Sequence, residues 1–182
     1  MALREIEYKA SRLWDLRGNL PDQPFATIDP GVHGALVIYG CADHARDRKP
    51  LRIAPLSIGD DALIRMLRDA GVRLVFIEAQ HMKMNASAVI KLARRAAVLA
   101  AILAGVHLDQ GLDVTLVWVH PASWQAVIRD LKKQGHGTKE SAQVVAAGLL
   151  DGDGRWIGAT AKQREGIADA LCMAVWVSRT FW

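Results

Sequence analysis

The sequence predicts an α/β protein in which helices flank a mixed sheet of five strands. Three short apolar runs come first along the chain, and later runs alternate with segments of helical periodicity. In that order the early strands pair antiparallel through short turns, and the later ones pair in parallel through helical crossovers. Two of the runs end in a carboxylate and a helical segment carries a third, so a candidate site is expected at one sheet edge.

The expected elements follow from period and from chain breakers. Residues 1–22 mix charges and end in a proline-rich stretch, so we expect an extension ahead of a domain that spans 23–182. Strands are expected at 25–29, 34–39, 51–56, 74–78 and 113–119. Helices are expected at 60–68, 85–105, 121–133, 138–150 and 161–178. The 85–105 segment has a small-residue face that suits either core packing or a dimer interface.

Length and composition limit the protein class. A chain of 182 residues forms one domain with a full core, and 51% hydrophobic with 23% charged residues argues against disorder. The net charge of +4 and the pI near 9.3 suit a polyanionic partner without proving one. Cys41 and Cys172 lack the spacing of a zinc site or a disulfide framework. With no bilayer-length apolar segment and no signal segment, we expect a cytoplasmic protein without membrane contact.

The carboxylates Asp29, Glu78 and Asp169 carry the chemistry. Asp29 and Glu78 end apolar runs, and adjacent strands would place both at one sheet edge. Asp169 interrupts an apolar helical face, with Glu165 one turn earlier on the same side. Burying carboxylates together is costly unless cations neutralise them, and oxygen ligands favour magnesium or manganese. Phosphodiester hydrolysis by two metal ions needs three or four such carboxylates from different elements.

This order of elements is that of the ribonuclease H-like fold, and the residues resemble RuvC-like Holliday junction resolvases over roughly residues 25–178. The resemblance rests on Ile28-Asp29-Pro30-Gly31 with Gly34-Ala35, on Ile77-Glu78, on Lys139 before a helix, and on Ala168-Asp169-Ala170-Leu171. It implies a homodimeric endonuclease, dependent on two Mg²⁺ ions per active site with Mn²⁺ as a substitute, that nicks two strands of a four-way DNA junction symmetrically. It also implies catalytic roles for Asp29, Glu78 and Asp169, with Lys139 as the matching lysine.

The chain departs from the family pattern at two positions. Many members carry the fourth metal ligand three residues before the last aspartate, where this chain has Gly166. Glu165 is the expected substitute, because its longer side chain also projects toward that face. The family also tends to place a lysine near the position of Trp124 and Gln125.

Several residues are expected to contact nucleic acid. His81, Met82 and Lys83 follow Glu78 in a loop that would lie beside the metals, where a methionine can wedge against unstacked bases. Two basic runs would track phosphates: the first includes Arg94 and Arg95, and the second includes Arg129, Lys132, Lys133 and Lys139.

Two alternatives stay open from the sequence. A non-catalytic nucleic-acid-binding protein of the same fold would use the basic helices and leave the acids vestigial. A sugar-kinase or actin-like ATPase also places an aspartate near a glycine on its first hairpin, but it needs two lobes and a longer chain. Metal-dependent cleavage separates the nuclease from the binding protein.

Overall fold

A computed structural model gives the fold and describes residues 4–7, 23–41, 45, 49–79, 99 and 114–181, with backbone alone for 4–7. Its sheet has the order β1-β6-β5-β2-β3-β4. The strands are β1 (Arg4–Glu7), β2 (Phe25–Ile28), β3 (Ala35–Tyr39), β4 (Arg52–Pro55), β5 (Leu74–Glu78) and β6 (Thr115–Val119). The predicted α/β class, a mixed ribonuclease H-like sheet flanked by helices, is confirmed, and all five expected strands are present as β2 to β6.

The pairing follows the predicted division. β3 lies antiparallel between β2 and β4, whereas β2, β5 and β6 pair in parallel. The sixth strand, β1, pairs in parallel with β6 at the sheet edge. Four residues of the segment expected to precede the domain therefore extend its sheet. Their short length explains why no period was visible in the sequence.

The helices are α2 (Asp60–Asp69), α4 (Pro121–Trp124), α5 (Arg129–Lys133), α6 (Thr138–Leu149), α7 (Gly154–Ile157) and α8 (Ala161–Phe181), with 3-10 turns η2 (Leu56–Ile58) and η3 (Gln125–Ile128). The prediction of one helix over 121–133 is wrong, because η3 separates α4 from α5. Trp124 and Ile128, both buried, anchor this segment in the core that contains α8. Among the described residues, no helix has the length and apolarity needed to span a bilayer.

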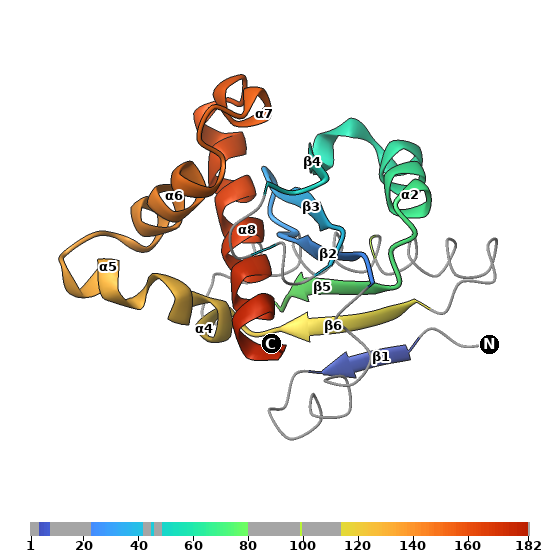
Figure 1. Cartoon of the computed structure of the whole chain (residues 1–182), viewed down its shortest axis with the longest axis horizontal. Helices are drawn as coiled ribbons and strands as arrows, with labels where there is room; N and C mark the ends of the chain where they lie inside the picture. The colour runs from blue at the N-terminus through green and yellow to red at the C-terminus, as the bar shows by residue number, and fades with distance from the viewer. Residues whose placement is uncertain are drawn as a thin grey trace.

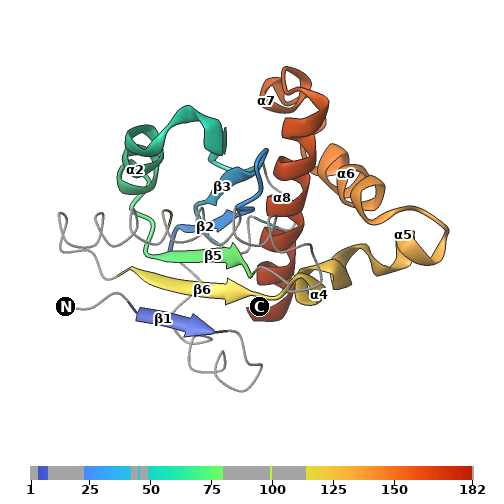
Figure 2. The same ribbon diagram turned by 180° about the vertical axis from the view of Figure 1, so that it is seen from behind.

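Alternate residues of β2, β3 and β5 point into two cores. Phe25 and Phe76 belong to the larger core with α6 and α8, whereas Ile28 and Ile77 belong to the smaller core with α2. Figure 1 and the reverse view in Figure 2 both place α8 beside the arrowheads of β5 and β6, and α2 toward the other ends of the strands. The strand ends that carry carboxylates therefore lie next to α8.

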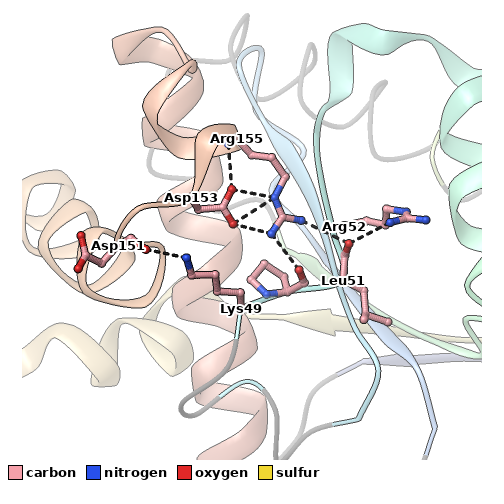
Figure 3. Close-up of polar contacts among 7 residues, drawn as sticks. Lys49, Leu51, Arg52, Asp151, Asp153 and Arg155 are labelled. Atoms are coloured by element: carbon pink, nitrogen blue, oxygen red, sulfur yellow. Dashed lines mark hydrogen bonds and ion pairs between the residues drawn. The ribbon is translucent and has the colours of Figure 1, made fainter.

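A polar cluster ties the short helix α7 to the segment that leads into β4 (Figure 3). The Asp153 carboxylate caps α7 by accepting a hydrogen bond from the Arg155 backbone N–H at 2.9 Å, and it pairs with the Arg155 guanidinium at 2.6 Å. That guanidinium also donates to the carbonyls of Pro50 and Leu51. The Lys49 ammonium donates to the Asp151 carbonyl at 2.6 Å. These contacts hold α7 and the turn before it against the segment that leads into β4.

Candidate active site

Strand register brings Asp29 and Glu78 together. β2 and β5 pair in parallel with Ile28 opposite Ile77, so the next residue of each chain segment stands at the same carboxyl edge of the sheet. Thr27 and Phe76 precede these acids by two positions and face α8, and the period of two directs both carboxylates to that face. The expectation that adjacent strands place the two acids at one edge is confirmed.

The turn after β2 fixes the Asp29 side chain. Its carboxylate accepts a hydrogen bond from the Gly31 N–H at 2.9 Å, and its own N–H donates to the Ala35 carbonyl at 3.1 Å. Gly34 closes this turn, where a Cβ atom would lie 1.9 Å from the Asp29 carbonyl oxygen. Only glycine fits at this position, which explains the glycine of Gly34-Ala35 in the sequence.

Helix α8 reaches the sheet edge through unusually close backbone contact. Gly34 and Gly166 form an isolated β-bridge, and a Cβ atom on Gly166 would lie 2.2 Å from the His33 carbonyl oxygen. One turn further along α8, the Thr27 hydroxyl donates to the Ala170 carbonyl at 2.8 Å. These two contacts flank Asp169 and hold it over the ends of β2 and β5. No side chain fits at 166, which is a physical reason for the missing acid at this position.

The three carboxyl groups interact electrostatically. Burial, together with the charges of Asp29 and Glu78, raises the pKa of Asp169 to about 8, against an opposing effect from Lys139. Burial, followed by the charge of Asp29, raises the pKa of Glu78 to about 7. The metal-free protein thus holds protons at neutral pH that ordinary carboxyls would release. A cation that binds among these carboxyl groups would stabilise their ionised form.

Lys139 and Glu165 complete the charged surroundings. Lys139, in the first turn of α6, forms an ion pair with Glu165 across to α8. The hydrogen bond to Glu165 raises the pKa of Lys139, and the charges of Asp169 and Asp29 act in the same direction. The predicted acid and lysine are therefore both at the site, but they pair with one another at its exposed side.

Trp124 belongs to the site, although the sequence predicts no role for it. Its indole N–H donates to a Glu78 carboxylate oxygen at 3.1 Å, and its side chain is only 2% exposed. The hydrogen bond lowers the pKa of Glu78 against the larger effect of burial. The sequence does offer a signal for this contact. Trp124 follows β6, the strand that pairs with the Glu78 strand, and a buried indole N–H usually finds a hydrogen-bond acceptor.

The carboxylates suit a divalent cation by their chemistry. Within the described ranges, no three His, Cys, Asp or Glu side chains form a ready metal cluster. Three acidic side chains, from the end of β2, from β5 and from α8, nevertheless meet at one partly buried edge, where burial and then mutual repulsion raise two pKa values. Carboxylates are hard oxygen donors, the ligand type that Mg²⁺ and Mn²⁺ prefer.

The remaining predicted residues divide into two groups. Lys132 and Lys133 are exposed on α5, next to exposed Arg129. His81, Met82, Lys83, Arg94 and Arg95, together with nearly all of the helix expected at 85–105 and its small-residue face, lie outside the described residues.

Comparison with known proteins identifies the fold. No protein-family model and no curated protein sequence matches the chain. Among solved structures, Thermus thermophilus RuvC aligns with a TM-score of 0.53 at 17% identity, over 85% of this chain and 95% of that one. The fold is that of RuvC-like resolvases. The RuvC-like match extends to T. thermophilus RuvC in complex with a Holliday junction substrate (TM-score 0.51, 15% identity, 85% and 94% coverage).

A eukaryotic structure agrees with this RuvC-like assignment. The yeast mitochondrial Holliday junction resolvase Ydc2 aligns with a TM-score of 0.58 at 12% identity, over 96% of this chain and 86% of that one. At these identities the likeness establishes the fold, so a role for each residue has to be argued from the site itself.

Proposed function

We propose that this protein is a metal-dependent DNA endonuclease that resolves four-way junctions by paired, symmetric nicks. The supporting observation is the meeting of Asp29, Glu78 and Asp169 at the carboxyl edge of a RuvC-like sheet, with two pKa values raised by burial and mutual repulsion. Structural ion networks also shift pKa values, but they do so with compensating charges inside the fold. Here the raised pKa values come from burial and from neighbouring carboxylates, and a cation that binds between such groups relieves both effects.

The residues have distinct proposed roles. Asp29, Glu78 and Asp169 would hold two Mg²⁺ or Mn²⁺ ions with Glu165 as fourth ligand, and the ions would supply a nucleophilic hydroxide and stabilise the leaving 3′ oxygen. The charge of Asp29 acts on both Glu78, on the neighbouring strand, and Asp169, on α8. Trp124 orients Glu78 through its indole N–H. Lys139 offers positive charge to the scissile phosphate once Glu165 turns toward the metals.

The substrate and assembly are part of the same proposal. Paired nicks require two active sites, so the protein acts on junction DNA as a homodimer. Loop residues His81, Met82 and Lys83, directly after Glu78 in the chain, contact the opened junction, and the basic residues Arg94, Arg95, Lys132, Lys133 and Lys139 contact phosphates. This activity belongs to DNA recombination and repair.

The test uses labelled four-way, forked and linear DNA with Mg²⁺, Mn²⁺ or chelator. We expect paired nicks in the junction that need the metal and fall by about a thousandfold or more in Asp29→Asn, because a metal ligand supplies several kcal/mol to the transition state. Asp151→Asn makes the same change at an exposed turn and serves as the matched control. Binding without cleavage under every condition would favour the non-catalytic DNA-binding protein.

A further inference from the structure

A basic groove runs along the outer face of α4, η3 and α5. Its volume is about 370 Å³, and it is lined by Ala122, Gln125, Ala126, Arg129, Lys132 and Lys133. These positions repeat at three- and four-residue steps, so they stay on one face although a 3-10 turn interrupts the helix. Ala122 and Ala126 line the part of the groove on α4 and η3. The cationic residues Arg129, Lys132 and Lys133 line the part on α5.

The charge of this face selects an anion. Between Pro121 and Lys139 the single acid is Asp130, which is 90% exposed and lies 3.4 Å from Lys133. An exposed pair of this kind contributes little and exchanges readily for another partner. Of the large hydrophobic side chains exposed in the described part of the chain, none lines the groove. The groove therefore offers a protein partner no large hydrophobic side chain as an anchor.

The groove begins next to the catalytic edge. Trp124 faces inward from the same segment and donates to Glu78, while Gln125, the next residue, lines the groove. Figure 1 shows α4 at the end of β6 beside α8, and α5 leading away from the sheet. A DNA strand that passes the carboxylates would meet Gln125 first, and Arg129 and the two lysines after it.

We infer that this groove binds the phosphodiester backbone of the DNA arm adjacent to the nicked phosphate. The inference rests on the proposed nuclease function and adds where one arm of the substrate lies. From Gln125 to Lys133 the segment rises roughly 13 Å, which corresponds to about four nucleotide steps of duplex axis. The groove holds the backbone without reading sequence, because its charged groups match phosphates rather than base edges.

The first experiment compares two triple variants that lower the net charge equally, from +4 to +1. R129Q/K132Q/K133Q empties the groove of charge, and R65Q/R68Q/R73Q removes three exposed arginines at and after α2. Junction binding is measured in chelator over a range of salt concentrations. The groove variant should lose about 2 to 3 units from the slope of log affinity against log salt, since each phosphate contact contributes about 0.9. The α2 variant should lose less than about one unit.

The second experiment maps the DNA directly and does not depend on charge. Ala126→Cys, in a Cys41→Ser background, is mixed with junctions that carry a thiol tether on single phosphates; Cys172 is buried and stays. Disulfide crosslinks should form at phosphates within about four nucleotides of the nick. The control Arg65→Cys, exposed on α2, should not crosslink at those phosphates.

The outcomes separate this inference from the proposed function. If wild type nicks junctions but the two triple variants lose the same slope and Ala126→Cys does not crosslink near the nick, the groove assignment is wrong and the nuclease stands. If wild type neither binds nor cleaves any DNA, the proposed function fails, and the groove assignment fails with it. Should R129Q/K132Q/K133Q prove unfolded by circular dichroism, the crosslinking result alone decides.

Discussion

Two aspartates, Asp153 at the start of α7 and Asp169 within α8, behave in opposite ways. Asp153 has a side chain only 7% exposed, yet Arg155 holds its pKa down at about 2 (Figure 3). Asp169 is also largely buried, but burial and two neighbouring carboxylates raise its pKa to about 8. The charge of Asp153 is stabilised by Arg155 within the protein. The charge of Asp169 is destabilised by burial and by its neighbours, and a bound cation would stabilise it.

The difference lies in where the counter-charge stands. Arg155 covers the Asp153 carboxylate with its guanidinium and donates a backbone N–H as well. Lys139 is the nearest corresponding cation for Asp169, but it pairs with Glu165 and its side chain is 68% exposed. Solvent screens its charge, so it does not offset the desolvation of Asp169. Uncompensated burial distinguishes a candidate catalytic carboxylate from a structural one.

The largest expected effect comes from separating the crowded carboxylates. Gly166→Ala places a Cβ atom 2.2 Å from a backbone oxygen, which forces α8 away from the turn after β2. We expect a loss of about 3 kcal/mol in unfolding free energy, because the clashing atom belongs to the His33 backbone and cannot move aside by a change of rotamer. Chemical denaturation measures it. Gly148→Ala, with open space around it in α6, should instead stabilise by about 0.5 kcal/mol; equal effects at both glycines would contradict the close contact.

The two aspartates should respond with opposite signs to the same substitution. Asp153→Asn removes the charge that pairs with Arg155 and weakens the cap of α7, so the free energy of unfolding should fall by about 2 kcal/mol. Asp169→Asn removes a repelled, desolvated carboxylate and should raise it by about 2 kcal/mol in chelator. Denaturant midpoints at pH 8 measure both. Destabilisation by both changes would mean that Asp169 is structural as well.

The comparison also predicts opposite pH dependence. Glu78 and Asp169 have folded-state pKa values of about 7 and about 8, above their ordinary values of 4.5 and 3.8. The folded state binds protons that the unfolded chain releases, so metal-free stability should fall as the pH rises from 5 to 8. Asp153, with a lowered pKa, loses its contribution only below about pH 4. Urea titrations in chelator test this, and a flat profile over that range would contradict it.

The smallest expected effect concerns the support of Glu78. Trp124→Phe keeps the ring but removes the N–H that donates to Glu78. A lost hydrogen bond of about 1 kcal/mol should weaken Mn²⁺ binding about fivefold, measured by calorimetry. Trp156→Phe changes a half-buried tryptophan on α7 and is the matched control. Identical affinities in the two variants would remove Trp124 from the site.

Much of this site was predictable because it depends on local pattern. The short apolar runs that end at Asp29 and Glu78 predict two buried strands, each followed by a break and each ending in a carboxylate. The apolar face around Asp169 predicts a buried helix. Pairing of β2 with β5 then follows from the usual order of such folds. The α/β class and the three acids therefore needed no tertiary information.

What the sequence did not reveal depends on contacts between distant segments. Gly166 looks like a missing ligand until α8 is seen to touch the turn at Gly34. The break at η3 lies in a segment with an unbroken helical pattern, and packing of Trp124 and Ile128 overrides that pattern. The pairing of Lys139 with Glu165 likewise joins two helices whose relative placement no local rule gives.

The most direct test of the account is the uptake of Mn²⁺ by the carboxylates, measured by isothermal calorimetry on metal-free protein at pH 8. Wild type should bind two ions per chain at saturation, as a two-metal site requires; Asp29→Asn and Asp169→Asn should lose most of this binding, and Asp151→Asn should keep it. If wild type binds no Mn²⁺, or if all three variants bind it like wild type, then Asp29, Glu78 and Asp169 do not form a metal site.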